Sequence, residues 1–267
     1  MKRIICYGAL ALVAGVVCLA AQQPAPAGRG AVAAPAAQAA PAEPSPEIKA
    51  VQAMVNARTD PDATIKLAEE LVTGFPNSTY KELALTMEGN AYQQKNKLVE
   101  AQVAFERLLA VNPKSLAANM TLGELITQQT GDKDFDKEKK LGDAEKYLKA
   151  AMDVLNAGKP NPRMSDQDWE ATKGVYSAEV HNDFGLVARF RKNYDVAVTE
   201  FQTAATLVKE PAYDARLADA LQLAGKNKES IAVCDRLLAD PQLHPTIKAL
   251  VTQVRTNAVA ASTPPAK

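Results

Sequence analysis

Histidine, aromatic residues and an excess of charge of either sign are scarce in this chain of 267 residues. Only two histidines occur, aromatic residues make up 5% of the sequence, and 31 Lys and Arg residues balance 31 Asp and Glu residues. An alanine-rich, aromatic-poor composition favours packed helices, because strands are enriched in β-branched and aromatic residues. The balanced charge gives no electrostatic reason to bind nucleic acid or an anionic membrane.

Signatures of catalysis and of metal binding are also missing. No second histidine or cysteine lies at ligand spacing from His181 or His244, so no zinc site is expected. The sequence has neither a G-x-S-x-G elbow nor a P-loop. Asp166, Asp168 and Glu170 open a predicted helix, where acids favour the positive end of the dipole. The sequence therefore predicts no enzyme activity and no cofactor.

Residues 1–21 have the composition of a secretory signal. Lys2 and Arg3 precede the apolar run IICYGALALVAGVVCLAA, which ends in small residues. We favour cleavage after this run, although its length of about 18 residues also suits an uncleaved anchor. Lipidation of Cys18 is a third alternative, disfavoured because Val17 is bulkier than the small residue that lipoprotein processing prefers. The protein is therefore predicted to be exported to the periplasm or cell envelope.

An alanine- and proline-rich segment, residues 22–46, follows the predicted signal and has almost no large apolar side chain. Such a segment cannot bury enough surface to fold, so a disordered tether is predicted there, and a short disordered tail at 260–267. Once the signal is removed, Cys234 is the remaining cysteine and no intramolecular disulfide is possible. Cys234 is predicted to be a buried small hydrophobe.

Apolar residues three and four apart, broken near prolines, predict helices from residue 47 onward. The predicted ranges are 47–58, 61–74, 79–95, 98–111, 115–129, 141–157, 166–191, 194–208, 212–224, 227–239 and 244–259. Ser165 is expected to cap the long helix, and Trp169 to seat it in the core.

A repeat of about 34 residues is the strongest signal in the chain. Its best copy comprises Leu85, Gly89, Tyr92, Ala101, Phe105, Leu108 and Pro113. Further copies carry Phe184, Gly185, Ala188, Ala197, Phe201 and Ala204; Leu217, Ala218, Leu221, Gly225, Ser230, Cys234 and Leu237; Leu122, Gly123, Ile126, Ala144, Leu148 and Ala151; and Ile48, Val51, Val55, Ala68, Leu71 and Pro76.

The order and spacing of these residues resemble the tetratricopeptide repeat, a pair of antiparallel helices A and B. Small residues such as Gly89 and Ala101 are expected where the two helices approach most closely, and Glu88 departs from the usual apolar position. About five tandem copies over 47–259, closed by a capping helix, imply an all-α, right-handed superhelical solenoid. An unrelated helical bundle is the structural alternative.

By this resemblance, a groove lined by helix A residues binds a partner protein or peptide. The matching positions are Thr86, Asn90, Gln93, Met120, Glu124, Thr127, Asn182, Leu186 and Arg189. They include no row of lysines and arginines, so the basic clamp that some members of the family use for a carboxylate is not expected. For any single one of these residues, an ordinary solvated helix face is the competing interpretation.

The run GDKDFDKEKKLGD, residues 131–143, has the acid spacing of a calcium loop at Asp132, Asp134, Asp136 and Asp143. Lysines stand at its sixth and eighth places, where glycine and an apolar residue are usual, and they offset the acids. We therefore interpret the run as a solvated insertion that lengthens the A–B turn of one repeat by nine residues, with Asp143 capping or beginning helix B.

Together these features predict a non-enzymatic interaction scaffold in the bacterial cell envelope, with a protein or peptide partner. The stretch Phe75–Leu85 also resembles repeat joints of envelope proteins that assist outer-membrane protein assembly or cell-wall machinery. An enzyme, or a calcium-responsive module, that uses the 127–143 insertion and the helix 166–191 is the alternative.

Overall fold

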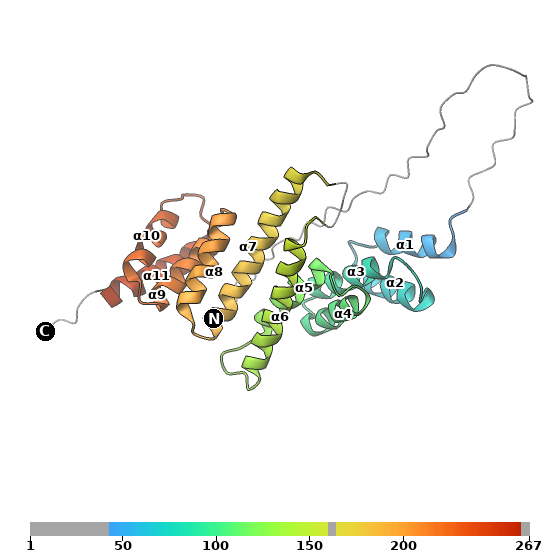
Figure 1. The fold of residues 1–267 in the computed structure, drawn as a ribbon, viewed down its shortest axis with the longest axis horizontal. Helices are drawn as coiled ribbons and strands as arrows, with labels where there is room; N and C mark the ends of the chain where they lie inside the picture. Colours follow the sequence, from blue (N-terminus) through green and yellow to red (C-terminus); the bar gives the residue numbers. More distant parts are fainter. Residues whose placement is uncertain (1–42, 160–163, 263–267) are drawn as a thin grey trace, which may run out of the picture. The chain divides into compact units, whose positions relative to one another are not determined.

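A computed structural model describes residues 43–159 and 164–262, which form α-helices without a strand (Figure 1). The helices are α1 (Pro46–Asn56), α2 (Pro61–Gly74), α3 (Lys81–Gln94), α4 (Leu98–Val111), α5 (Leu116–Gln129), α6 (Lys137–Asn156), α7 (Asp166–Phe190), α8 (Tyr194–Leu207), α9 (Pro211–Leu223), α10 (Asn227–Leu238) and α11 (Pro245–Ser262). The predicted signal and most of the predicted tether lie outside the described residues. Within those residues no helix is long and apolar enough to cross a membrane.

The predicted helices are present, and their ends lie within two residues of the predicted ends except at the start of α6 and the end of α11. Ser45 caps α1 by accepting a hydrogen bond from the Ile48 amide, so α1 begins one residue inside the predicted tether. At the other end α11 continues to Ser262, into the predicted tail. The start of α6 at Lys137 corrects the predicted start at 141. Asp143 therefore neither caps nor begins that helix but lies in its second turn.

The helices pair as α1/α2, α3/α4, α5/α6, α7/α8 and α9/α10, and α11 packs on the last pair. Each second helix of a pair also packs on the first helix of the next pair. First helices touch one another as well, α5 with α7 and α9 with α11. This arrangement is a right-handed superhelical solenoid whose first helices form one layer and second helices the other. We call the face of the first-helix layer that points away from the second helices the inner face.

A glycine facing a phenylalanine sets the distance between the helices of a pair. A Cβ atom added to Gly89 would lie 2.7 Å from the Phe105 ring, and one added to Gly185 would lie 2.6 Å from the Phe201 ring. Both rings are fully buried. Burying a phenylalanine side chain stabilises a fold by about 1.5–3 kcal/mol, and only glycine leaves room for the ring here. The predicted close approach at Gly89 is confirmed.

The third and fifth pairs show variants of this contact. In the third pair, a Cβ atom added to Gly123 would lie 2.5 Å from the Leu148 side chain. In the fifth pair, Ala218 takes the place of glycine, and Cys234, which is fully buried, takes the place of phenylalanine. A larger residue on one helix is thus matched by a smaller one on the other. Cys234 is buried as predicted.

The length of the insertion can be counted from the Gly123–Leu148 contact. Residue numbers 89 and 105, and likewise 185 and 201, differ by sixteen, whereas 123 and 148 differ by twenty-five. The nine additional residues are those the sequence predicted. Comparison with the α3/α4 pair shows that four lengthen the loop, four add a turn at the start of α6 and one extends α5.

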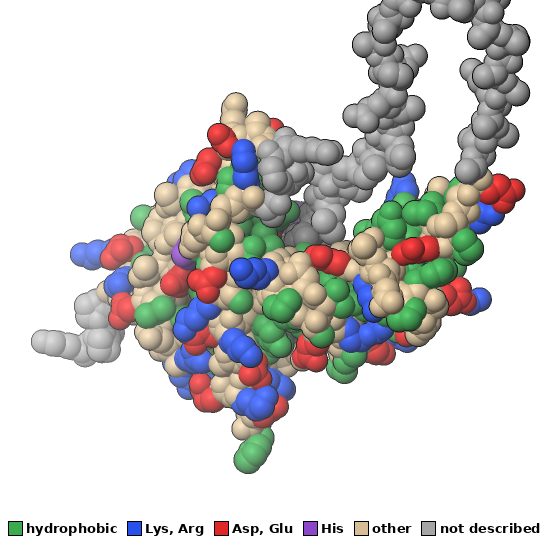
Figure 2. Space-filling model, turned by 45° about the vertical axis from the view of Figure 1, so that its right-hand side comes forward, with side chains coloured by type: hydrophobic (Ala, Val, Ile, Leu, Met, Phe, Trp, Pro, Cys, Tyr) green, Lys and Arg blue, Asp and Glu red, His purple; other side chains and the backbone are tan. Residues whose placement is uncertain are grey.

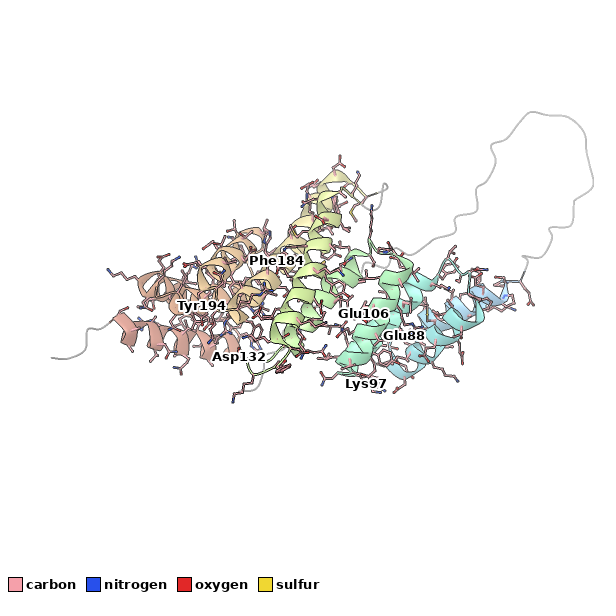
Figure 3. The ribbon with its side chains drawn as sticks, turned by 60° about the horizontal axis from the view of Figure 1, so that its bottom comes forward. Glu88, Lys97, Glu106, Asp132, Phe184 and Tyr194 are labelled. Carbon is pink, nitrogen blue, oxygen red and sulfur yellow. The ribbon has the colours of Figure 1, made fainter. Side chains whose placement is uncertain are left out.

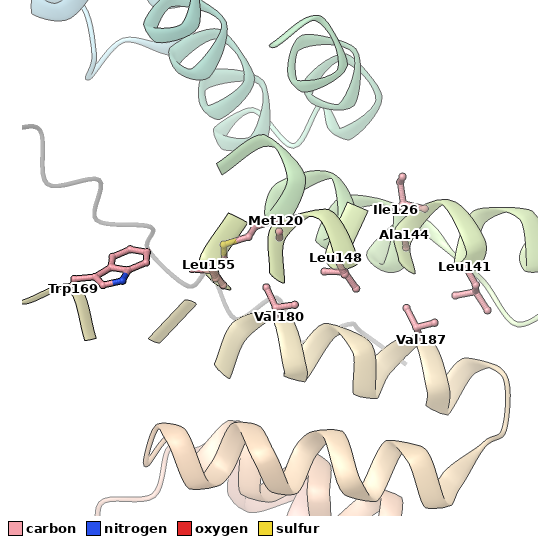
Figure 4. Close-up of a cluster of buried hydrophobic side chains, with 10 residues drawn as sticks. Met120, Ile126, Leu141, Ala144, Leu148, Leu155, Trp169, Val180 and Val187 are labelled. Atoms are coloured by element: carbon pink, nitrogen blue, oxygen red, sulfur yellow. The ribbon is translucent and has the colours of Figure 1, made fainter. Parts of the chain in front are cut away.

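The longer α6 packs against α7 to form one continuous core (Figure 4). Leu141, Leu148 and Leu155 of α6 lie between side chains of α5 and α7, and Trp169 is buried at one end, as predicted. Ser165 caps α7 as predicted, since its side chain accepts a hydrogen bond from the Asp168 amide at 3.0 Å.

Glu88, which departs from the repeat pattern, is buried with 2% of its surface exposed. Its Oε1 atom accepts a hydrogen bond from Arg107 Nη1 at 2.9 Å, and its Oε2 atom has no hydrogen-bond partner among the described residues. Burial raises the pKa of the Glu88 carboxyl, and the positive charge of Arg107 opposes that rise. A buried charge with an unsatisfied oxygen costs stability relative to an apolar residue.

We expect Gly185→Ala to destabilise the domain by about 1–3 kcal/mol, because the added methyl group overlaps the buried Phe201 ring. Gly174→Ala in the same helix is the control. A Cβ at Gly174 meets nothing within 4 Å, so this variant should gain about 0.5–1 kcal/mol from helix propensity. Urea unfolding of residues 44–267, which form one compact unit, measures both. Equal effects of the two substitutions would contradict the packing described above.

We also expect Glu88→Leu to stabilise the domain by about 1 kcal/mol or more, because it removes a buried charge, and Arg107 can turn to water. The side chain of Arg107 is already 39% exposed. Arg107→Leu is the matched opposite, since it leaves Glu88 buried without its cation and should cost about 3–5 kcal/mol. A loss of stability in Glu88→Leu, measured by the same urea titration, would show that the ion pair stabilises the fold.

Candidate functional site

The residues predicted to line a groove differ in burial. Six of the nine keep partial exposure on α3, α5 and α7: Thr86, Asn90, Gln93, Glu124, Leu186 and Arg189. The other three are more than nine-tenths buried: Met120, Thr127 and Asn182. Thr127 donates its hydroxyl to the Gly123 carbonyl at 2.7 Å, and Met120 belongs to the core between α5 and α7. These two side chains therefore contribute to packing.

Polar residues of three successive first helices influence one another electrostatically. Glu124 lies on α5, Glu179 and Asp183 on α7, and Tyr213 and Arg216 on α9, and we call these five residues the central cluster. Asp183 is 8% exposed, whereas the other four are partly exposed. The cluster thus combines three carboxylates with one guanidinium.

Asn182 links the charges of the central cluster. It donates its side-chain amide to Asp183 Oδ1 at 3.0 Å, and its Oδ1 atom accepts a hydrogen bond from Arg216. Glu124 accepts a hydrogen bond from the Gln128 amide at 2.8 Å. Beside the cluster, Arg189 of α7 pairs with Asp219 of α9 at 2.6 Å. The links from Asn182 to Arg216 and from Arg189 to Asp219 hold α7 against α9.

The carboxyls of the cluster are harder to ionise than carboxyls in water. Burial raises the pKa of Glu179 to about 7, and the negative charge of Glu124 adds to this rise. Burial likewise raises the pKa of Asp183 well above its usual value, with Glu124 contributing and Arg216 opposing. For Tyr213, burial raises the pKa to about 12. The charge of the inner face therefore changes near neutral pH.

Four members of the cluster, all except Glu124, were not among the predicted site residues. Asp183 stands two residues before Gly185, and Arg216 stands two residues before Ala218, so both occupy the same place in their repeats. Equivalent positions of neighbouring first helices lie close together in a solenoid. Charged residues at one repeat position were therefore the signal that could have found them.

The four aspartates of the insertion are each paired with a lysine. Lys140 lies 2.9 Å from Asp134 and 3.2 Å from Asp136, and Lys139 lies 2.7 Å from Asp143. Asp132, labelled in Figure 3, pairs with Lys137 at 3.5 Å. Asp134 also accepts a hydrogen bond from the Gly131 amide at 2.8 Å. Across 43–159 and 164–262, no group of three or more His, Cys, Asp or Glu side chains is placed so that it could hold a metal ion.

A cleft of about 370 Å³ lies between α6, α7 and α8, near the helix named in the enzyme alternative. Phe184 and Val187 contribute apolar side chains to it, and Figure 3 marks Phe184. Its polar residues bind one another. His181 lies 2.7 Å from Glu200, and Arg191 and Lys149 each lie 2.8 Å from Glu145. Such mutually paired groups do not favour an enzyme site.

Comparison of the sequence with protein-family models and with curated proteins gives no match. Among solved structures, a MamA RS-1 double mutant is similar with a TM-score of 0.54 and 13% identity, over 82% of this chain and 99% of that chain. MamA AMB-1 is similar with a TM-score of 0.52 and 15% identity, over 76% of this chain and 96% of that chain. A thermophilic TPR protein of Thermus thermophilus is 21% identical over 80% of this chain and 99% of that chain, with a TM-score of 0.49.

At these identities the likeness concerns the fold. The chain has the fold of the tetratricopeptide-repeat proteins, as its repeat pattern predicted. The structural alternative, an unrelated helical bundle, is therefore rejected.

We expect the free energy of unfolding to fall as the pH rises from about 4.5 to about 7, the usual and the folded pKa of Glu179. The sign follows because the folded state holds the Glu179 proton more tightly than the unfolded chain does. Glu179→Gln should flatten this slope, and the residual slope belongs to the raised pKa values of Glu88, Glu124 and Asp183.

Glu106→Gln, on the exposed face of α4 (Figure 3), is the control and should leave the slope unchanged. Urea titrations at a series of pH values measure the slope of the free energy of unfolding against pH. An equal slope in Glu179→Gln and the unaltered chain would contradict the assignment to Glu179.

Proposed function

We propose that this protein is a non-enzymatic scaffold that binds a partner protein through the inner face of its solenoid. The observation that carries the proposal is the row of partly exposed, polar side chains that successive first helices bring to one face. Packing in a solenoid requires each helix to bury only the side that contacts its neighbours. The inner face is not used for that packing, so it is available to bind a partner.

An extended segment of the partner suits this face. The side-chain amides of Asn90 and Gln93 make no hydrogen bond with other described residues, and both are partly exposed. Amides of this kind can donate to and accept from the backbone of an extended peptide. Leu186, half-buried on α7, offers an apolar contact further along the same face. The inner face would thus act as a groove.

The face shown in Figure 2 intersperses positive and negative side chains, with no large area of one sign. Such a surface keeps a protein soluble and selects no particular charged partner. The mutual pairing of the polar groups in the α6–α8 cleft also supports a binding role over catalysis.

We further propose that the scaffold works in the bacterial cell envelope. Support comes from the composition of residues 1–21, with a basic start, an apolar middle and a small-residue end, and from the alanine- and proline-rich stretch that follows.

Site-specific photo-crosslinking in cells tests the binding face. A photoreactive amino acid at Asn90 or Leu186, on the inner face, should form an adduct with a discrete partner. The same group at Val103, which is 50% exposed on α4, is the control and should form none. Adducts from Val103 alone, or equally from every position, would contradict a groove on the inner face.

Fractionation of the same cells tests the location. The chain should be recovered from the periplasm or membrane fraction, shortened by about 21 residues if the signal is removed. A full-length chain confined to the cytoplasm would contradict export.

A further inference from the structure

We propose that two copies of this chain associate by inserting Phe135 of each copy into the α6–α8 cleft of the other. Phe135 lies in the loop of the insertion, between α5 and α6, and the cleft lies between α6, α7 and α8. Neither belongs to the inner face, so this self-association goes beyond the proposed function and uses a different surface.

Phe135 is the most exposed of the large hydrophobic side chains in the described part of the chain. Its exposed fraction is 107%, and that of the next, Val99 of α4, is 65%. A phenylalanine in this position forgoes the free energy that burial of its ring would provide. Aromatic side chains that become buried on binding dominate the energy of many protein interfaces. The exposed ring is therefore suited to anchor an interface.

The loop around Phe135 is held by ion pairs and a hydrogen bond. Lys140 of α6 lies 2.9 Å from Asp134 and 3.2 Å from Asp136, so one lysine holds the residues on both sides of Phe135. Asp134 also accepts a hydrogen bond from the Gly131 amide at 2.8 Å. An anchor that is preorganised in this way loses less conformational entropy on binding.

The α6–α8 cleft has the size and the lining for an aromatic ring. Its volume is about 370 Å³, which is more than twice the roughly 150 Å³ of a cavity that holds benzene. Phe184, Val187 and Val196 line the cleft with apolar side chains, and Val196 is 43% exposed to solvent. A ring that enters the cleft would pack on Phe184, and aromatic pairs are favourable beyond the area that they bury.

The charged groups of the cleft already have partners. His181 lies 2.7 Å from Glu200, and Glu145 lies 2.8 Å from both Lys149 and Arg191. An apolar ring in the cleft therefore leaves none of these charges without a counter-ion. A charged occupant would have to displace one of the pairs, so the cleft favours an apolar occupant.

A second copy of the chain can supply this occupant because Phe135 and the cleft are neighbours. Arg191, which lines the cleft, lies 3.2 Å from Glu138, and Glu138 follows Phe135 by three residues. The loop before α6 and the turn after α7 also lie at the same end of these helices (Figure 1). A two-fold axis between two copies can then place each Phe135 in the cleft of the other copy, and such a contact closes as a dimer.

The charges near Phe135 favour another copy over a membrane. In residues 131–140 four lysines balance four acidic residues. Attachment to an anionic membrane draws on an excess of basic residues, which this loop lacks. Two surfaces with balanced charge meet without repulsion. Residues 22–46 are not suited to fill the cleft, since they carry almost no large apolar side chain.

Sedimentation velocity of residues 44–267, which form one compact unit, measures the association. Two small contacts place the dimer in the weak, transient class, with a dissociation constant of about 10–100 µM. The unaltered chain should therefore change from monomer to dimer between about 1 and 500 µM. A chain that stays monomeric over this range overturns the inference.

One substitution on each side of the contact tests which residues meet. Phe135→Ala should weaken the dimer by about tenfold or more and leave urea stability unchanged, because the ring is fully exposed in the single chain. Val196→Glu places a charge in the cleft and should weaken the dimer by a similar factor. Val103→Glu alters a valine of similar exposure, 50%, on α4, and as the matched control should dimerise like the unaltered chain. A dimer that either Phe135→Ala or Val196→Glu leaves intact contradicts the contact.

Mixing the two variants distinguishes docking from an indirect effect. The intact Phe135 of the Val196→Glu chain can enter the intact cleft of the Phe135→Ala chain, so the mixture should associate more tightly than either variant alone. Absence of this recovery rules out docking of the ring in the cleft. Binding of the unaltered chain, but not of Phe135→Ala, to vesicles of phosphatidylcholine and phosphatidylglycerol without dimerisation would assign the ring to a membrane instead. The photo-crosslinks from the inner face test the proposed function separately.

Discussion

Every described pair of helices from α3 to α10 has a small residue of its first helix facing a bulkier residue of its second. Gly89 faces Phe105, and Gly185 faces Phe201, in each case with a fully buried ring over the glycine backbone. The contact has two consequences. It brings the two helices of a pair close enough to bury their apolar stripes, and it fixes the rotation of the first helix about its axis. That rotation determines which residues of the first helix lie on the inner face.

The rotation explains why the central cluster forms where it does. With Gly185 against Phe201, Asn182 and Asp183 of α7 point towards the neighbouring first helices, where Arg216 of α9 meets Asn182. These polar residues hold α7 to α9 while keeping partly exposed carboxylates on one face. The residues that link α7 to α9 are thus adjacent in sequence to partly exposed polar residues of the same helix.

Most of the fold was predictable because it depends on local periodicity and on one repeated contact. Helix types, the repeat, the nine-residue insertion, the cap at Ser165 and the burial of Trp169 and Cys234 all follow from residue spacing. The start of α6 was missed because the charged run before residue 141 has no apolar periodicity, although four of its residues continue the helix. Ion pairs stabilise that added turn: Arg191 lies 3.2 Å from Glu138 and 2.8 Å from Glu145, and Lys140 pairs with Asp136.

The candidate site was less predictable. Positions of the groove could be transferred from the repeat pattern, but the pattern does not say which are buried, and Met120 and Thr127 are. Contacts between first helices of different repeats join residues about thirty apart in sequence, such as Asn182 with Arg216. Periodicity within one helix carries no information on such contacts, whereas comparison of equivalent repeat positions does.

A double-mutant cycle between Gly185 and Phe201 tests most directly the claim that this contact sets the helix pair. Gly185→Ala, Phe201→Cys and the double variant are compared by urea unfolding of residues 44–267. The double variant should be more stable than the sum of the single effects by about 1 kcal/mol or more, because a cysteine, which faces Ala218 in the α9/α10 pair, makes room for the added methyl group. Strict additivity of the two effects would contradict the account.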